Sequence, residues 1–205
     1  MYLVLRRGAI ESLSRAGELA GAAAVRCVRA FADDERLAAW RDRPRKVCLR
    51  ARNAAQWREV LDEPHALAGE PAGEAVCALP PRRLSERGAL LERLQAMSGA
   101  LGPPPARGSD GDAPLTYVLN PAAIMSSGKT LAQIAHAAVM AAEHLEDWAS
   151  AGCPARVLAP DAAGFAAAGA ADGCVARVVD AGLTEIAPGT VTVVALSGAL
   201  PAELR

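Results

Sequence analysis

The chain has 205 residues, of which 52% are hydrophobic and only 3% aromatic, and its formal net charge is −1. This length can bury one substantial core or two small ones, and no apolar run reaches the roughly 18 to 20 residues that a membrane span needs. The five cysteines show no CxxC spacing. We therefore expect a reduced, cytoplasmic protein with no zinc site, no leader segment and no membrane association.

The first part of the chain begins with an apolar strand at 2–5 and carries most of the basic charge. Up to Pro114 there are 18 basic and 15 acidic residues, against 4 and 8 after it. Basic residues are dense between 41 and 52, and we expect Arg43, Arg45 and Arg50 to contact an RNA backbone, because nonspecific affinity for nucleic acid comes mainly from neutralising phosphates. The alternative reading of such a run is a solvated face.

A connecting region follows at 82–114. Four apolar residues between 82 and 98 fall at roughly helical spacing and predict a helix there. Residues 102–112 contain Gly-Pro-Pro-Pro and then several small or acidic residues, a composition that favours neither helix nor strand. We therefore expect two domains, at 1–81 and 115–205, joined by a helix and a linker.

The second half predicts an alternation of strands and helices. Because helices separate the first strands, those strands should run parallel through right-handed crossovers. The last two strands are joined by a loop too short for a crossover helix and should be antiparallel. The result is a mixed four-stranded sheet with helices on its faces. The predicted strands are 115–120, 155–159, 176–180 and 191–196, and the predicted helices are about 127–148 and 161–171.

Two polar motifs stand at the ends of these elements. Met-Ser-Ser-Gly-Lys-Thr at 125–130 begins a helix, and Asp-Ala-Gly-Leu-Thr at 180–184 follows a strand. A serine or Gly128 would cap the helix, so its first amides and its positive dipole end would suit a phosphate or carboxylate beside Lys129. Gln133 lies four residues after Lys129, on the same helical face.

Together these motifs resemble the second class of peptidyl-tRNA hydrolase, the archaeal and eukaryotic type, over residues 115–197. The resemblance implies a three-layer α/β/α fold and hydrolysis of the ester that joins a peptide to the terminal ribose of tRNA. It also implies that peptidyl-tRNA is the partner and that no metal or cofactor is needed.

The resemblance also implies roles for single residues. The family's catalytic positions correspond in this chain to Lys129, Asp180, Thr184 and Thr192. Asp180 would hold or deprotonate the attacking water, Lys129 would stabilise oxyanion charge or a phosphate, and the threonines would orient substrate and water. We further expect four residues to contact the substrate: Gly128, Gln133, His136 and Thr190.

The two halves share a weak internal repeat. The run 19–25 aligns with 131–137, each following an apolar strand, and three further segments align in the same order. The sequence therefore predicts a tandem pair of small three-layer α/β/α domains, each with a mixed, roughly four-stranded sheet, which could pack as an intramolecular pseudo-dimer. Under this alignment Gly17 stands opposite Lys129 and Gly21 opposite Gln133, so the first copy should be chemically empty, a scaffold or a binding half.

Other readings stay open. Asp180 could simply cap a turn, the threonines could be ordinary strand residues, and His136 could be a packed helix residue. Family members usually carry a basic and an acidic residue after the first strand, where this chain has Asn120 and Pro121. The alternative function is therefore a changed or inactive family member that binds RNA, a nucleotide or a protein.

Overall fold

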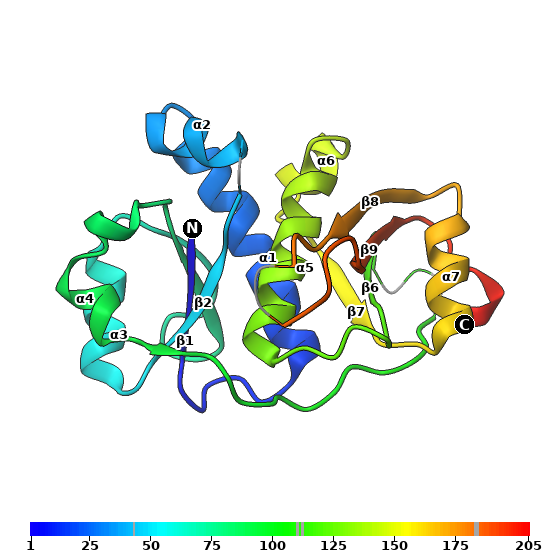
Figure 1. Ribbon diagram of the computed structural model, residues 1–205, viewed down its shortest axis with the longest axis horizontal. Helices are drawn as coiled ribbons and strands as arrows, with labels where there is room; N and C mark the ends of the chain where they lie inside the picture. Colours follow the sequence, from blue (N-terminus) through cyan, green and yellow to red (C-terminus); the bar gives the residue numbers. More distant parts are fainter. Residues whose placement is uncertain (43, 110, 112, 183–184) are drawn as a thin grey trace.

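Two mixed β-sheets lie on either side of a central helix pair in the computed structural model of the protein (Figure 1). The structure describes residues 1–42, 44–109, 111, 113–182 and 185–205. The central helices are α1 (Leu13–Ala30) and α5 (Ser127–Ala142), one from each half of the chain. The fold is α/β, as predicted.

The N-terminal sheet has five strands in the order β3-β4-β1-β2-β5. β1 and β2 are parallel, and every other neighbouring pair is antiparallel. α1 packs on the inner face of this sheet, and α3 contacts β1 and β2 from the outer face. Its strands are β1 (Tyr2–Arg6), β2 (Val47–Ala51), β3 (Ala66–Gly69), β4 (Ala75–Leu79) and β5 (Gln95–Ala96), and its further helices are α2 (Glu35–Asp42), α3 (Ala54–Asp62) and α4 (Gly88–Arg93).

The C-terminal sheet has four strands in the order β7-β6-β9-β8. As predicted, β6 and β7 are parallel, and β8 and β9 are antiparallel. α5 packs on the inner face and α7 on the outer face. The strands are β6 (Leu115–Leu119), β7 (Ala155–Leu158), β8 (Cys174–Val179) and β9 (Val191–Ser197), with helices α6 (Glu146–Ser150) and α7 (Ala162–Ala170) and a short 3₁₀ helix, η2 (Ala202–Leu204).

The two halves follow the same path. If β5 is set aside, the order β3-β4-β1-β2 matches β8-β9-β6-β7, with the same parallel and antiparallel neighbours. The helices between corresponding strands match as well, α1 with α5 and α3 with α7. This common topology supports the internal repeat, although duplication of one ancestral unit stays a prediction.

One hydrophobic core joins the halves. Its buried residues come from α1, α5 and both sheets. Gly17 makes the close approach of α1 feasible, because a Cβ there would lie 2.8 Å from Ile134 and 2.9 Å from Val157. Gly21 does the same, since its Cβ would lie 2.7 Å from the Tyr117 hydroxyl. The glycines that stand opposite Lys129 and Gln133 in the repeat thus belong to the packing surface between the halves.

The structure differs from the single helix predicted within 82–98. A 3₁₀ helix, η1 (Leu84–Glu86), is followed by the six-residue α4 and then by β5. Gly88, the first residue of α4, has a φ of +70°, a left-handed conformation that prevents one continuous helix through η1 and α4. Leu91 and Leu94 enter the outer core of the N-terminal sheet, whereas Met97 turns to the shared core. The apolar residues that suggested one helix are therefore buried in two separate cores.

The helix predicted at 127–148 is also interrupted. α5 ends at Ala142, and α6 begins at Glu146 after a tight turn in which the amides of His144 and Leu145 both donate to the Ala141 carbonyl. The turn lets Trp148 bury its ring and donate its indole N–H to the Pro154 carbonyl at 2.8 Å.

The linker lies across both halves. The Gly102 amide donates to the Glu11 carbonyl at 2.8 Å, and the Pro105 carbonyl accepts from Ala159 at 2.8 Å. The Gly108 amide donates to the Leu204 carbonyl at 2.9 Å. These bonds attach the connecting segment first to the N-terminal half and then to the C-terminal half.

In the part of the chain that the structure describes, no helix is both long and apolar enough to cross a membrane. All five cysteines are free thiols.

Candidate functional site

The site begins at the N-terminus of α5. The Ser126 hydroxyl caps the helix by accepting from the Lys129 amide at 3.3 Å. Glu185, from the loop between β8 and β9, accepts from the Ser126 amide at 2.7 Å and from its hydroxyl at 2.8 Å. The helix end that was expected to suit a phosphate or carboxylate is thus bound by a carboxylate of the chain itself, and the positive end of the helix dipole favours this negative charge.

Sequence reasoning missed Glu185. It lies 59 residues from Ser126 along the chain, and nothing in the local pattern of a loop acid distinguishes a helix-end partner from a solvated side chain. Only the pairing of β8 with β9, which returns this loop to α5, brings the two residues together.

The first turn of α5 also places Lys129 against the end of β8. Its Nζ lies 2.7 Å from Asp180 Oδ2. The Lys129 side chain is 18% exposed and that of Asp180 only 4%. An ion pair shielded to this degree is screened by solvent far less than a surface pair. The structure therefore brings together the ammonium and carboxylate that the two motifs supply.

Asp180 has two further hydrogen-bond donors. Gln133 Nε2 donates to Oδ2 at 2.5 Å, and the Gly182 amide donates to Oδ1 at 2.8 Å. Burial opposes ionisation of this carboxyl, but the bonds from Lys129, Gly182 and Gln133 outweigh it and hold the pKa of Asp180 below its usual value. The group is a fixed carboxylate at neutral pH.

Thr192 lies on β9 beside this site, but its side chain is buried. Its hydroxyl donates to the Val178 carbonyl at 3.3 Å. The residue stands where the β8–β9 register shifts, between the pairs Val178↔Val193 and Val179↔Val191. Such bulges commonly re-aim side chains next to functional sites.

The other threonines of the motif differ in their surroundings. Thr190 is partly buried, and its hydroxyl donates to the Ala187 carbonyl at 2.8 Å, within its own loop. Its carbonyl accepts from the Asp180 amide at 2.8 Å, so its backbone supports the carboxylate. The predicted role of Thr184 falls outside the described residues.

His136 faces the N-terminal half rather than the ion pair. Its Nδ1 lies 3.0 Å from Lys46 Nζ, and its ring stacks on Trp40 with 6.4 Å between centroids. Burial, with the charge of Lys46 as a smaller cause, lowers the pKa of His136 from 6.5 to about 3. Burial also lowers the pKa of Lys46 well below its ordinary value. These two groups meet where the halves are in contact, and the folded state disfavours the protonated form of each.

Gly128 packs tightly against the connecting segment. A Cβ there would lie 2.1 Å from the Met97 carbonyl oxygen. Glycine at the start of α5 is therefore explained by this close approach, and contact between Gly128 and a substrate stays a prediction.

The described basic residues between 41 and 52 differ in their exposure. Arg45 is exposed, whereas Arg50 is half-buried and its Nε is buried without a hydrogen-bond partner among the described residues. Lys46 is turned toward His136. Arg43 lies outside the described residues. Of the three arginines expected to contact RNA, only Arg45 is placed as an exposed cation.

Residues 115–204 match the family model described as peptidyl-tRNA hydrolase PTH2. The match covers the whole of the C-terminal sheet and both polar motifs, and it confirms the resemblance for this half. A comparison with curated proteins gave no match.

Proposed function

We propose that the C-terminal half, a domain of the peptidyl-tRNA hydrolase PTH2 family, hydrolyses the ester between a peptide and the terminal ribose of tRNA. The contact of 2.7 Å between Lys129 and Asp180, within the matched region, is the observation that supports this proposal most strongly. Water adds to the ester carbonyl and gives up a proton, and the carbonyl oxygen becomes an oxyanion. Collapse of this intermediate breaks the bond to the ribose oxygen, which takes up that proton and leaves as the ribose hydroxyl.

Lys129 would stabilise the negative charge that develops on the carbonyl oxygen, or a neighbouring phosphate. A charged donor stabilises transition-state charge much more strongly where water is largely excluded than in bulk solvent. Lys129 has the required partial burial, with 18% of its side chain exposed. Asp180 keeps its ammonium group in place.

Asp180 is better suited to hold the attacking water than to deprotonate it. A general base works best when its pKa is near the working pH, whereas the pKa of Asp180 is lowered. Each of its oxygens already accepts at least one bond, so the carboxylate is fixed in direction. Gln133 is a positioning residue that maintains this direction.

The threonines would complete the site. Thr192 would act from the bulge in β9. Its hydroxyl would first release its hydrogen bond to the Val178 carbonyl and then bond to substrate or water. Thr184 and Thr190 would orient substrate from the loop, and the proposal assigns no metal or cofactor. A substrate of translation would place the protein in the cytoplasm.

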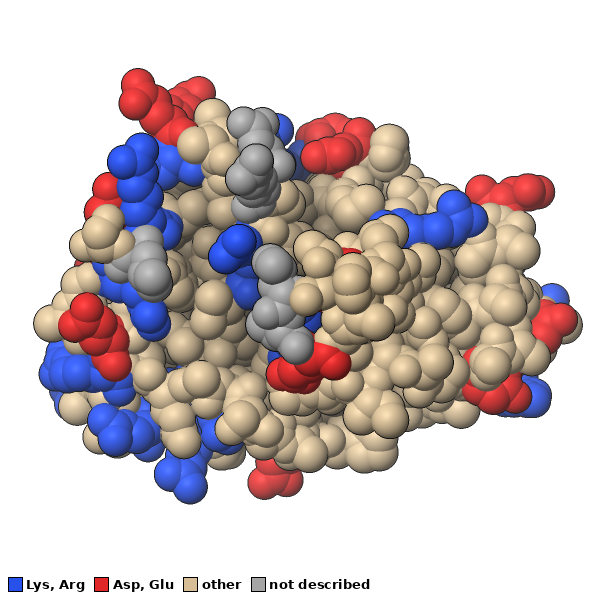
Figure 2. Space-filling view, in the orientation of Figure 1, with Lys and Arg blue, Asp and Glu red and all other residues tan. Residues whose placement is uncertain are grey.

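The N-terminal half would serve as scaffold and as part of the RNA-binding surface. On the face drawn in Figure 2, blue basic side chains are concentrated over this half, at left, whereas uncharged residues cover most of the C-terminal half. In the N-terminal half, glycines replace the positions of Lys129 and Gln133 and are used for packing, so no second catalytic pair is proposed there.

One observation favours the alternative, a binding module without turnover. Asn120, where family members usually carry charge, uses its side chain locally. Its Nδ2 donates to the Val191 carbonyl at 2.6 Å, and its Oδ1 accepts from the Ala122 amide at 2.9 Å. A residue engaged in this way supports the loop rather than a substrate.

Turnover of peptidyl-tRNA by the purified protein distinguishes the two functions. We expect release of peptide from the wild type and a loss of about 100-fold or more for Lys129→Met and Asp180→Asn, since removal of one oxyanion-stabilising donor costs about that much. Asp172→Asn is the matched control, because Asp172 is exposed and lies before β8. Absence of turnover, or full activity of either site variant, would refute the proposal.

A further inference from the structure

A pocket lies in the N-terminal half, and neither Lys129 nor Asp180 lines it. It has a volume of about 660 Å³ and is formed by α2, the ends of β1 and β2, and the segment after β4. This volume is within the range of small-molecule sites. Four arginines line it, Arg36, Arg45, Arg82 and Arg83, against one acid, Glu35, and Trp40 forms part of the wall.

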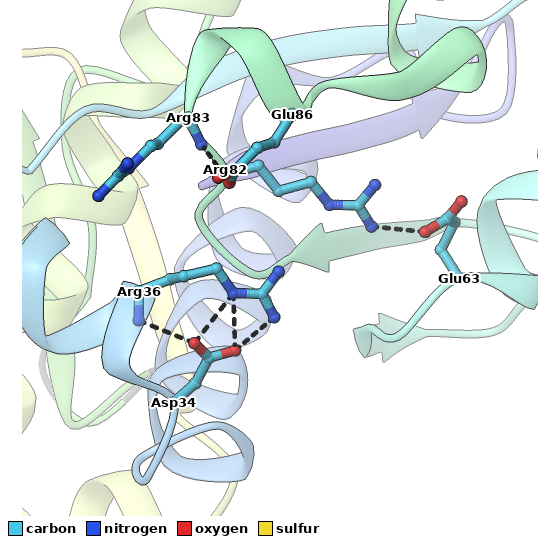
Figure 3. A network of polar contacts seen from close by, with 6 residues as sticks. All are labelled: Asp34, Arg36, Glu63, Arg82, Arg83 and Glu86. Atoms are coloured by element: carbon cyan, nitrogen blue, oxygen red, sulfur yellow. Dashed lines mark hydrogen bonds and ion pairs between the residues drawn. The ribbon is translucent and has the colours of Figure 1, made fainter.

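Two of these arginines are held in place by acids (Figure 3). Arg36 binds both carboxylate oxygens of Asp34, with contacts of 3.0 and 2.6 Å. Arg82 pairs with Glu63 at 2.5 Å, and its side chain is only 15% exposed. Guanidinium groups fixed in this way lose little further freedom when they bind an anion.

The other two have no acidic partner among the described residues. The contact drawn at Arg83 in Figure 3 belongs to its backbone amide, which donates to Glu86 at 3.3 Å. Arg45 uses its backbone carbonyl to accept from the Trp40 indole at 2.7 Å. The two exposed guanidinium groups therefore bring uncompensated positive charge to a pocket whose other cations are already oriented.

The wall of this pocket leads to the catalytic helix. Trp40 stacks on His136 with 6.4 Å between ring centroids and 11° between planes. His136 is seven residues after Lys129 on α5, about 10 Å along the helix axis. An RNA strand whose end is held at Lys129 would thus reach the pocket within a few nucleotides.

We propose that this pocket binds a phosphate of the substrate RNA, a few nucleotides from the cleaved ester, with Arg45 and Arg83 as its direct contacts. The inference rests on the proposed function for its choice of ligand. Arginine suits the site because its planar guanidinium makes paired hydrogen bonds to phosphate oxygens. The arrangement would give the N-terminal half, which lacks the catalytic pair, a share in substrate binding.

The test measures binding of tRNA without a peptide by the full chain, over a range of salt concentrations, for the double variant Arg45→Gln/Arg83→Gln. We expect about ten-fold weaker binding at low salt. The slope of log affinity against log salt should fall by roughly 1.4 to 1.8, the change for two lost phosphate contacts. With peptidyl-tRNA, KM should rise while kcat stays unchanged, because neither arginine touches the reacting atoms.

The matched control is Arg7→Gln/Arg58→Gln, which removes the same charge from exposed arginines outside the pocket. Equal losses in both double variants would show diffuse attraction and overturn the proposal, as would unchanged binding in the pocket variant. If the wild type binds no RNA but binds an acidic protein, the proposal also fails. If the wild type binds RNA through these arginines yet shows no turnover, the proposal for the pocket is supported and the proposed hydrolase function is refuted.

Discussion

Lys46 Nζ and His136 Nδ1 lie 3.0 Å apart across the boundary between the two halves. Among the described residues neither has a carboxylate partner, and the Lys46 amine lies 4.5 Å from the centroid of the Trp40 ring. Burial lowers the pKa of both groups. The folded state therefore disfavours the protonated form of both groups, which makes the stability of the protein depend on pH.

Replacement of Lys46 by methionine should stabilise the protein at pH 7. The unfolded chain carries a protonated lysine there, whereas the folded state resists protonation because the amine is buried. Removal of the amine removes this penalty, so the free energy of unfolding should rise by about 1 kcal/mol or more. Urea unfolding of Lys46→Met and wild type measures the difference. Lys46→Arg is the control, which should be less stable than wild type, and a destabilised Lys46→Met would contradict this account.

The protein should become less stable as pH falls from 6.5 to about 3, the range between the unfolded and folded pKa values of His136. Between pH 6.5 and about 3 the unfolded chain binds a proton at this histidine that the folded state does not bind. The free energy of unfolding should therefore decrease as pH falls through that window, by up to about 1.4 kcal/mol per pH unit for this one group. Denaturant curves at several pH values for wild type and His136→Gln test this. The variant should show a shallower slope between pH 6 and 4, and equal slopes would exclude His136 as the cause.

Substitution of Gln133 by leucine should move the acid limb of the activity profile to higher pH. The bond from Gln133 Nε2 to Asp180 helps to hold the pKa of that carboxyl low. Without it the carboxylate takes up a proton at a higher pH. The pH dependence of kcat/KM measures the shift. Gln133→Glu should shift the limb further because of like-charge repulsion with Asp180. If the limb does not move in either variant, protonation of Asp180 does not control the activity.

Two glycine substitutions should change the free energy of unfolding in opposite directions. Gly128→Ala places a Cβ 2.1 Å from the Met97 carbonyl oxygen, so we expect a loss of about 1–3 kcal/mol in the free energy of unfolding. A methyl group added at Gly169, within α7, would meet no atom of the described residues within 4 Å, and Gly169→Ala should gain about 0.5–1 kcal/mol. Thermal and urea unfolding give both values. Tolerance of alanine at 128 would show that the connecting segment can move away from α5.

The parts of the fold that follow from short-range pattern were predictable. The lengths of the loops between strands determine whether the neighbours run parallel or antiparallel, and β6–β7 and β8–β9 obey this. Loop lengths along the chain were sufficient for these strand directions. The pairing of Lys129 with Asp180 was expected from the resemblance to the hydrolase family, and in the structure the start of α5 lies beside the end of β8.

Features that depend on packing between segments were not predictable. The leucines at 91 and 94 and the methionine at 97 have helical spacing but serve two different cores. His136 shares a helical face with Lys129, yet it is paired with Lys46 because α5 is packed against the other half. Glu185 has no local signature. In each case the partner lies in a segment whose position the sequence pattern does not specify.

The glycine at position 17 has a consequence for the history of the two halves. A lysine there would have to begin from a Cβ 2.8 Å from Ile134 and 2.9 Å from Val157, so it could not enter without separating α1 from its neighbours. The close contact between the halves at this position therefore disfavours, in the first half, a lysine equivalent to Lys129.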